Sequence, residues 1–319
     1  MRHLLCLILA WFAFASTAFA QGLVADSPNF QLRSDVAVDA PLLLSDLERF
    51  RKAVLDDLGL DDAPDREPLR LNLVDDIAVF EAVSPGGMTA AIYLDSDAGD
   101  DIVVGYSRSP GHRLSDALEP GWLRLVLRHE VVHHLIETRY PRKLPIWLGE
   151  GLAEYYSTYQ ADHDGRARFG QALPEQEPLS ATQDWLPMRT VIENMGTYPD
   201  FRGTIDASAY RAQRIYYGQS WALAQFVIEQ PDGLARIHRF VDGWSPEDGS
   251  PNADSEDSFE RAFGLRYDGL EARLREAAER SSPIAAPAET PADASAVRVR
   301  SLGETEREAN HLRLLLTHA

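Results

Sequence analysis

The chain has 319 residues, 45% of them hydrophobic and 25% charged, which suffices for one large domain or two moderate ones with a sizeable core. This composition excludes a wholly disordered chain. Acidic residues outnumber basic ones by 50 to 31, so the formal net charge is −19. Because a nucleic-acid backbone and an anionic membrane surface both repel such a chain, neither is expected as its main partner.

The first twenty residues have the pattern of a cleaved secretory signal peptide. A short basic start precedes an apolar run at 4–15, and the small-x-small sequence Ala18-Phe19-Ala20 stands before Gln21. The alternative is a membrane anchor, but a membrane span needs about 20 apolar residues and this run is shorter. We therefore expect residues 1–20 to be removed at Ala20/Gln21 and the protein to be periplasmic or secreted, with no membrane span afterwards.

Cysteine usage narrows the possible chemistry. The only cysteine, Cys6, lies inside the predicted signal peptide. The mature chain is therefore expected to have no thiol, which excludes disulfides, cysteine metal ligands and cysteine nucleophiles.

Residues 21–115 are predicted to form an α+β lobe with a small mixed or antiparallel sheet. Leucines at helical spacing predict a helix over 42–58. Short β-type runs separated by turn residues predict four strands, at 30–33, 69–74, 88–94 and 101–106.

Residues 116–280 are predicted to form a mainly helical lobe of the same domain. Apolar periodicity predicts helices at 120–139, 145–159, 210–229, 234–244 and 259–280, the last either continuous or broken at Gly264. Proline, glycine and polar residues make 165–206 an irregular connection. The Pro/Ala-rich stretch 281–298 predicts a flexible linker, and 299–319 a tail with a short helix around Leu312–Leu316.

The strongest chemical signal is the sequence HEVVH at 129–133, in the middle of the predicted helix 120–139. His129 and His133 are four residues apart, so both imidazoles lie on one helical face and can reach a single metal ion. Glu130 lies to the side of that face, where it can hydrogen-bond a metal-bound water without being a ligand.

The surroundings of this motif also favour a metal. The helix is apolar nearly all round and should be buried, which would leave its histidines and glutamate uncompensated unless something binds them. His134 points away from His133, and we interpret it as a helix-surface residue or one that supports the site from outside.

A third metal ligand is expected, because a catalytic zinc site usually has three protein ligands and one position for water. Glu150 is the candidate: Gly149 and Gly151 flank it, so another helix or the metal can approach closely. Its distance along the chain from the histidines fits two antiparallel helices. Glu154 lies one turn further on the same face, where it can bind the outer nitrogen of a ligating histidine. The alternative for Glu154 is a solvated helix glutamate.

With these residues the chain resembles the gluzincins, zinc metallopeptidases with HExxH on one helix and a glutamate ligand on the next. Residues 147–153, WLGEGLA, are similar to the W-L-N-E-G-F-A segment of M1-type aminopeptidases, and Glu150 with Glu154 resembles the E-x-x-x-D of the thermolysin branch. The nearest resemblance is to small bacterial peptidase MA-like domains. It implies a zincin-like α+β catalytic domain with Zn²⁺ held by His129, His133 and Glu150.

The resemblance also implies a tyrosine that stabilises the oxyanion. Tyr217, in YGQS at 217–220, is the candidate and Tyr216 the reserve; the alternative is a pair of core or surface tyrosines. M1-type exopeptidases carry a glutamate for the substrate amine on the strand before the zinc helix, and strand 101–106 lacks one. We expect this strand to take up an extended peptide by edge pairing, which suits an endopeptidase.

The function expected from these residues is zinc-assisted hydrolysis of peptide bonds in a peptide or protein substrate, with Glu130 as general base and Tyr217 at the oxyanion. Two alternatives stay open. One is a non-catalytic envelope protein that keeps a zincin fold as a scaffold or binding module. The other is a structural zinc site, which would normally have four side-chain ligands.

Overall fold

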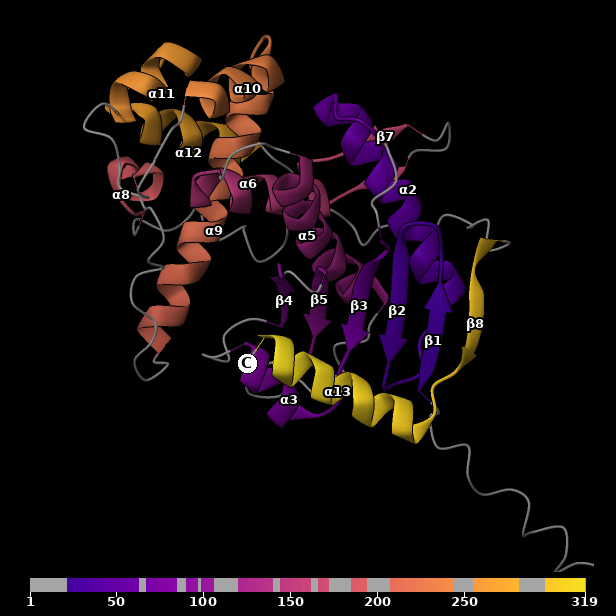
Figure 1. Ribbon diagram of the computed structural model, residues 1–319. Helices are drawn as coiled ribbons and strands as arrows, with labels where there is room; N and C mark the ends of the chain where they lie inside the picture. Colours follow the sequence, from indigo (N-terminus) through magenta and orange to yellow (C-terminus); the bar gives the residue numbers. More distant parts are fainter. Residues whose placement is uncertain are drawn as a thin grey trace, which may run out of the picture.

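The structure is a computed structural model that describes residues 22–62, 67–84, 90–96, 99–105, 120–139, 144–161, 166–171, 185–193, 207–243, 255–280 and 296–318. The predicted signal peptide and most of the predicted linker lie outside the described residues. The described residues form a sheet-containing lobe and a helical lobe, and the helix α5 (Pro120–Arg139) lies between them (Figure 1). Among them, no helix combines the length and apolar character needed to cross a bilayer.

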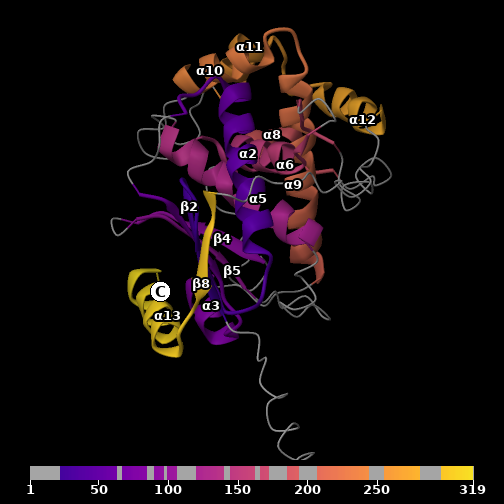
Figure 2. The same ribbon diagram turned by 90° about the vertical axis from the view of Figure 1, so that its right-hand side faces the viewer.

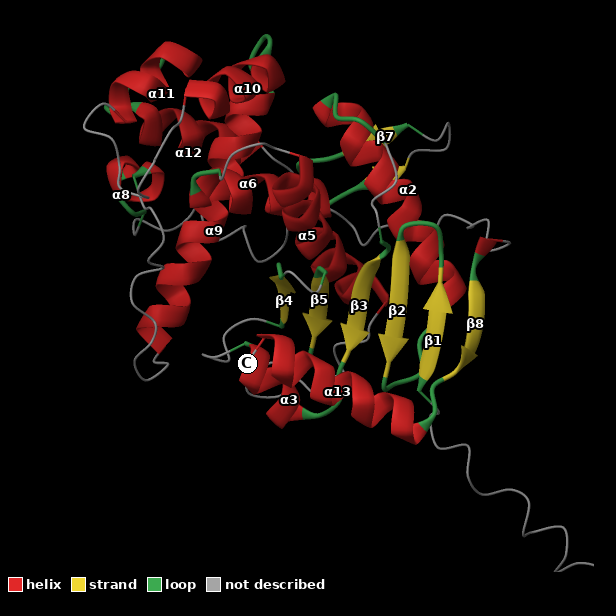
Figure 3. Ribbon diagram, in the orientation of Figure 1, coloured by secondary structure: helices red, strands yellow, loops and turns green. Residues whose placement is uncertain are grey.

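The first lobe is built on a mixed six-stranded sheet with the order β4-β5-β3-β2-β1-β8. β2, β3 and β5 run parallel, whereas β4 pairs antiparallel with β5, and β1 pairs antiparallel with β2 and β8 (Figure 3). The prediction of an α+β fold with a mixed sheet is confirmed. The strands are β1 (Leu23–Asp26), β2 (Phe30–Ser34), β3 (Leu69–Leu73), β4 (Ala91–Leu94), β5 (Asp101–Val104) and β8 (Arg298–Ser301).

Helices cover both faces of this sheet. α2 (Ala40–Leu58) and α5 (Pro120–Arg139) pack on one face, and α3 (Ile77–Val83) and α13 (Glu304–His318) on the other (Figures 1 and 2). Successive side chains of β5 point to opposite faces of the sheet. Ile102 therefore belongs to the main core with α2 and α5, while Val103 packs in a smaller cluster with Leu314 of α13.

The helical lobe follows α5. Its elements are α6 (Ile146–Ser157), the hairpin β6 (Gln160–Ala161) and β7 (Ala167–Arg168), α8 (Met188–Ile192), α9 (Ala207–Ile228), α10 (Gly233–Gly243), α11 (Ser255–Phe263) and α12 (Leu270–Arg280). Gly264, with φ of 72°, ends α11, so of the two alternatives for 259–280 the broken pair is correct. The predicted irregular segment 165–206 contains β7 and α8 in its described part.

The end of the chain returns to the first lobe instead of forming a separate tail. β8 adds to the sheet beside β1, with Ser301 opposite Leu23, and α13 is longer than the short helix that the sequence predicts around Leu312–Leu316. Residues 298–318 are therefore part of the sheet-containing lobe.

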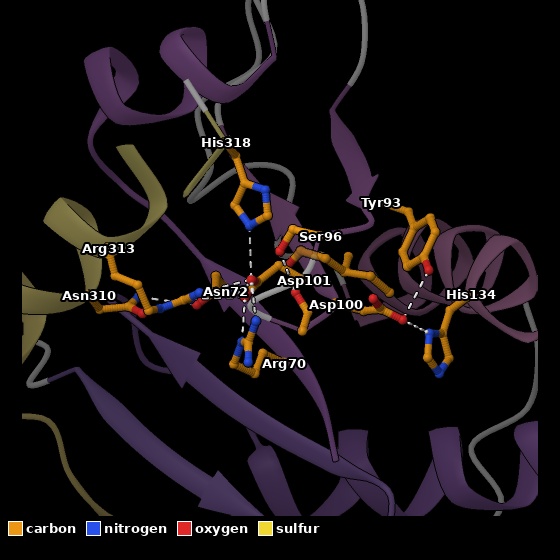
Figure 4. Close-up of polar contacts among 12 residues, drawn as sticks. Arg70, Asn72, Tyr93, Ser96, Asp100, Asp101, His134, Asn310, Arg313 and His318 are labelled. Atoms are coloured by element: carbon orange, nitrogen blue, oxygen red, sulfur yellow. Dashed lines mark hydrogen bonds and ion pairs between the residues drawn. The ribbon is translucent and has the colours of Figure 1, made fainter. Parts of the chain in front are cut away.

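A buried carboxylate fastens α13 to the sheet. Asp101 is fully buried at the start of β5 and accepts hydrogen bonds from Arg70 (2.8 and 3.0 Å), Arg313 (2.8 and 2.9 Å) and His318 (3.1 Å) (Figure 4). Burial alone would raise the pKa of Asp101, but the hydrogen bonds from Arg313 and Arg70 bring that pKa below its ordinary value. The ionised carboxylate thus joins β3, β5 and the C-terminal helix.

Candidate metal centre

Two consecutive helices bring the predicted ligands together. α5 is buried along its apolar residues and packs against α6, whose Trp147, Leu148 and Leu152 have no exposed surface. His129 and His133 come from the middle of α5, and Glu150 from the first turns of α6. These three residues form the one group of potential metal-binding side chains found among the described residues.

The three donor atoms lie at metal-ligand spacing. The Nε2 atoms of His129 and His133 are 3.1 Å apart, and Oε2 of Glu150 is 3.3 Å from the first and 3.6 Å from the second. Two atoms bound tetrahedrally to zinc at 2.0–2.1 Å are about 3.3–3.4 Å apart. The donor set, two imidazoles and a carboxylate, therefore fits zinc in both chemistry and spacing.

Charge complementarity accompanies this geometry. Burial alone would lower the pKa of His129, but its hydrogen bonds with Glu150 and Glu154 raise that pKa well above its ordinary value. Burial alone would raise the pKa of Glu150, but the neighbouring His133 and His129 bring it below its ordinary value. The carboxylate of Glu150 is thus ionised and aimed at the imidazoles.

Glu154 lies behind His129. Its Oε1 atom is 3.4 Å from Nδ1 of His129, the ring nitrogen that faces away from the Glu150 carboxylate. Its side chain is only 17% exposed. This placement matches the predicted role of orienting His129 more closely than that of a solvated glutamate.

Glu130 is buried next to the cluster, and its side chain is within reach of the sheet. Burial raises the pKa of Glu130 above its ordinary value, while the nearby His129 and His133 oppose this shift. The backbone N–H of Tyr93, on β4, is close enough to this carboxylate to oppose the shift as well. A carboxylate with a raised pKa beside a candidate metal site has the properties of a proton acceptor.

The two candidate tyrosines of α9 differ in position. The ring of Tyr217 is partly buried and lies edge-on to the ring of His129, with centroids 6.2 Å apart. Tyr216 is 1% exposed and its hydroxyl lies 3.5 Å from the carbonyl oxygen of Val191. Tyr217 is therefore beside the cluster, and Tyr216 belongs to the core.

The structure decides two expectations about the surroundings of the cluster. Of the two interpretations of His134, a position at the helix surface is wrong and one that supports the site from outside is left, because His134 is 4% exposed and its Nδ1 atom lies 2.9 Å from Oδ2 of Asp100 (Figure 4). The predicted strand 101–106 is not an edge, because β5 pairs with β3 on one side and β4 on the other. Of the strands near α5 it is β4, the preceding strand, that has one described neighbour only.

Arg128 connects the two helices of the cluster, a role that the sequence did not reveal. It is 3% exposed and binds Asp46 of α2 through two nitrogens at 2.8 and 3.1 Å. It also donates to the carbonyl oxygen of Tyr159, just beyond α6, at 3.0 Å. A lone arginine next to a histidine carries no sequence signal for such a role, since its partners are distant along the chain.

Comparison with models of known protein families gave no match, and neither did a search of curated proteins. The assignment of a function therefore depends on the residues and the geometry described above.

Proposed function

We propose that this protein is a zinc-dependent metallopeptidase, more specifically an endopeptidase, that resembles the gluzincins. The observation that carries the proposal is the triangle of donor atoms from His129, His133 and Glu150, with sides of 3.1, 3.3 and 3.6 Å. Three protein ligands leave one position of a tetrahedral ion for water or substrate, which is the arrangement of catalytic rather than structural zinc sites.

When bound, zinc polarises the carbonyl of the scissile bond and lowers the pKa of water in its coordination sphere towards about 7. Glu130 accepts a proton from the attacking water, a transfer that its raised pKa favours, and passes the proton to the leaving amine. Tyr217 donates a hydrogen bond to the developing oxyanion, and Glu154 holds the His129 ring through Nδ1.

The edge strand β4 supports a peptide as the substrate. Among the described strands β4 pairs with β5 alone, and we infer that an extended peptide adds along its other side as a further strand. The link between Tyr93 and Glu130 places this strand beside the cluster. A substrate paired with β4 continues past the site in both directions, which favours cleavage inside a chain.

The test is a comparison of three proteins, the wild type, Glu130→Gln and His129→Ala, in zinc binding and in hydrolysis of denatured casein with and without chelator. Glu130→Gln should keep zinc and lose at least about 10²-fold in turnover, because only the proton acceptor is removed. His129→Ala should lose both. Zinc-loaded wild type that leaves casein and a peptide library intact would contradict the proposal and favour the non-catalytic scaffold.

Export to the periplasm or medium stays a prediction, because residues 1–20 lie outside the described residues. N-terminal sequencing of the protein recovered from cells tests it, since cleavage should expose Gln21.

A further inference from the structure

Two adjacent carboxylates near the start of β5 bind helices on opposite faces of the sheet (Figure 4). Asp101 binds Arg313 of α13. Asp100 binds the metal-site helix α5, with Oδ2 2.9 Å from Nδ1 of His134. Because successive residues of an extended chain face opposite ways, this dipeptide ties both layers of helices to one point of the backbone.

Asp100 also holds the edge strand. The hydroxyl of Tyr93, on β4, donates to the same Oδ2 atom at 3.0 Å. The Tyr93 ring lies edge-on to His134, with centroids 5.8 Å apart. One carboxylate oxygen therefore joins β4 to the residue that directly follows the HEVVH sequence.

Tyr93 reaches α5 by a second route, through its backbone. Its N–H group is close enough to the carboxylate of Glu130 to lower the pKa of that group, while its side chain reaches His134 through Asp100. Since β5 is the only described strand that pairs with β4, these cross-links to α5 contribute strongly to where β4 lies.

We propose that Asp100 is a positioning residue that fixes the edge strand β4 against α5 and so sets how a substrate backbone paired with β4 meets Glu130. This inference rests on the proposed function for its consequence in catalysis. Asp100 does not touch the metal ligands in any described contact; it acts through Tyr93 and His134. His134 thereby has a structural role, the positioning of β4 through Asp100, which is distinct from metal binding and from acid–base chemistry.

Hydrogen–deuterium exchange of the zinc-free protein tests the placement of β4 independently of catalytic activity. In Asp100→Ala the peptide covering residues 91–94 should exchange at least about tenfold faster, because a charged acceptor shared by two donors is lost. Peptides from β1 and β2 should be unchanged, and zinc affinity should stay within about threefold. Unchanged exchange at 91–94 would overturn the proposal whatever the activity.

A matched pair at His134 separates positioning from general stability. In His134→Asn the amide nitrogen stands where Nδ1 stands and keeps the donor to Asp100, whereas His134→Leu removes it. His134→Leu should reproduce the faster exchange and lower casein turnover at least about tenfold, and His134→Asn should restore both. Equal exchange in the two variants would overturn the proposal, and they carry the test if Asp100→Ala does not fold.

The outcomes for the two proposals are distinct. Hydrolysis by the wild type tests the peptidase, and strand exchange tests Asp100. A wild type that cleaves nothing would end the proposed function, and the exchange measurement would still decide whether Asp100 positions β4.

Discussion

Gly151→Ala should weaken zinc binding, whereas Gly149→Ala, two residues away, should not. Both glycines flank Glu150, and the structure distinguishes them. A Cβ atom at Gly151 would lie 2.4 Å from the backbone oxygen of Ser220 and 2.9 Å from Cβ of Ala224, both on α9. A Cβ atom at Gly149 would have nothing within 4 Å. Close approach of another helix therefore requires a glycine only at position 151.

The size of the effect follows from these contacts. To bring the Gly151 contact to a normal distance, α6 has to move away from α9 by roughly 0.6 to 1.0 Å, because both contacting groups are parts of helices. Glu150 is the preceding residue of α6, so its carboxylate moves by a similar amount. Its separations of 3.3 and 3.6 Å from the imidazoles then change by a large fraction of the tolerance of a tetrahedral site.

We expect Gly151→Ala to cost about 1–3 kcal/mol of stability through overpacking and to weaken zinc binding at least about tenfold. Gly149→Ala should keep zinc affinity and stabilise α6 by about 0.5–1 kcal/mol, since alanine favours a helix over glycine. The measurements are zinc competition against a chromophoric chelator and unfolding with and without zinc. Wild-type affinity in Gly151→Ala, or equal weakening in both variants, would refute the idea that the α6–α9 contact places Glu150.

Three further predictions concern the site and the C-terminal helix. Tyr217→Phe should lower turnover by about 10²–10³ with zinc affinity retained, and a fall of less than about threefold would remove Tyr217 from the mechanism. Asp101→Asn should lower the free energy of unfolding by on the order of 3 kcal/mol, because Arg70 and Arg313 lose their shared buried carboxylate; a change below about 1 kcal/mol in denaturant titrations would count against this account. Nε2 of His311 donates a hydrogen bond to Oδ2 of Asp35 at 2.8 Å, which raises the pKa of that histidine, so this pair should stabilise the protein fully below about pH 6.5 and progressively less as pH rises through the raised pKa. Unfolding free energies of the wild type and His311→Gln, measured across this range, should therefore converge at high pH, and a constant gap would show that the pair does not titrate in this way.

The grouping of His129 with His133 could be predicted because the information for it is local. Residues four apart on a helix share a face, so the relation of His129 to His133 needs no knowledge of the rest of the fold. Glu150 required one further assumption, that the next helix turns back over the first. The helices themselves were predictable for the same reason, and α5 begins at Pro120, where proline suits a first turn.

The contacts around the cluster could not be predicted, because they depend on the order of strands in the sheet. Nothing in the sequence of residues 91–104 shows that β5 lies between β3 and β4 in the sheet. The edge strand is therefore β4, which carries Tyr93, and not β5. Asp100 and His134 are likewise brought together only by the packing of α5 on that sheet.

The C-terminal segment was misjudged for a different reason. All four residues of β8 are exposed, and the strand has only Val299 between two arginines, which is too short an apolar pattern to indicate burial. In α13 the leucines that suggested a short helix include Leu312 and Leu316, which are 56% and 78% exposed, whereas the helix is anchored by Asn310, Leu314 and its basic residues. Hydrophobic periodicity in the sequence does not reveal a helix that is held by polar contacts of this kind.

The pairing of β1 with β8 has a consequence for biosynthesis. In the folded protein Leu23 of β1 lies opposite Ser301 of β8. The ribosome synthesises β8 some 270 residues after β1, so β1 can pair with it only near the end of synthesis. Until then Asp101 also lacks Arg313 and His318, so a nascent chain holds an incomplete, poorly neutralised interior. Chains arrested before residue 298 should be digested readily by added protease, and completion of the sheet-containing lobe is thereby deferred to the last moments of synthesis.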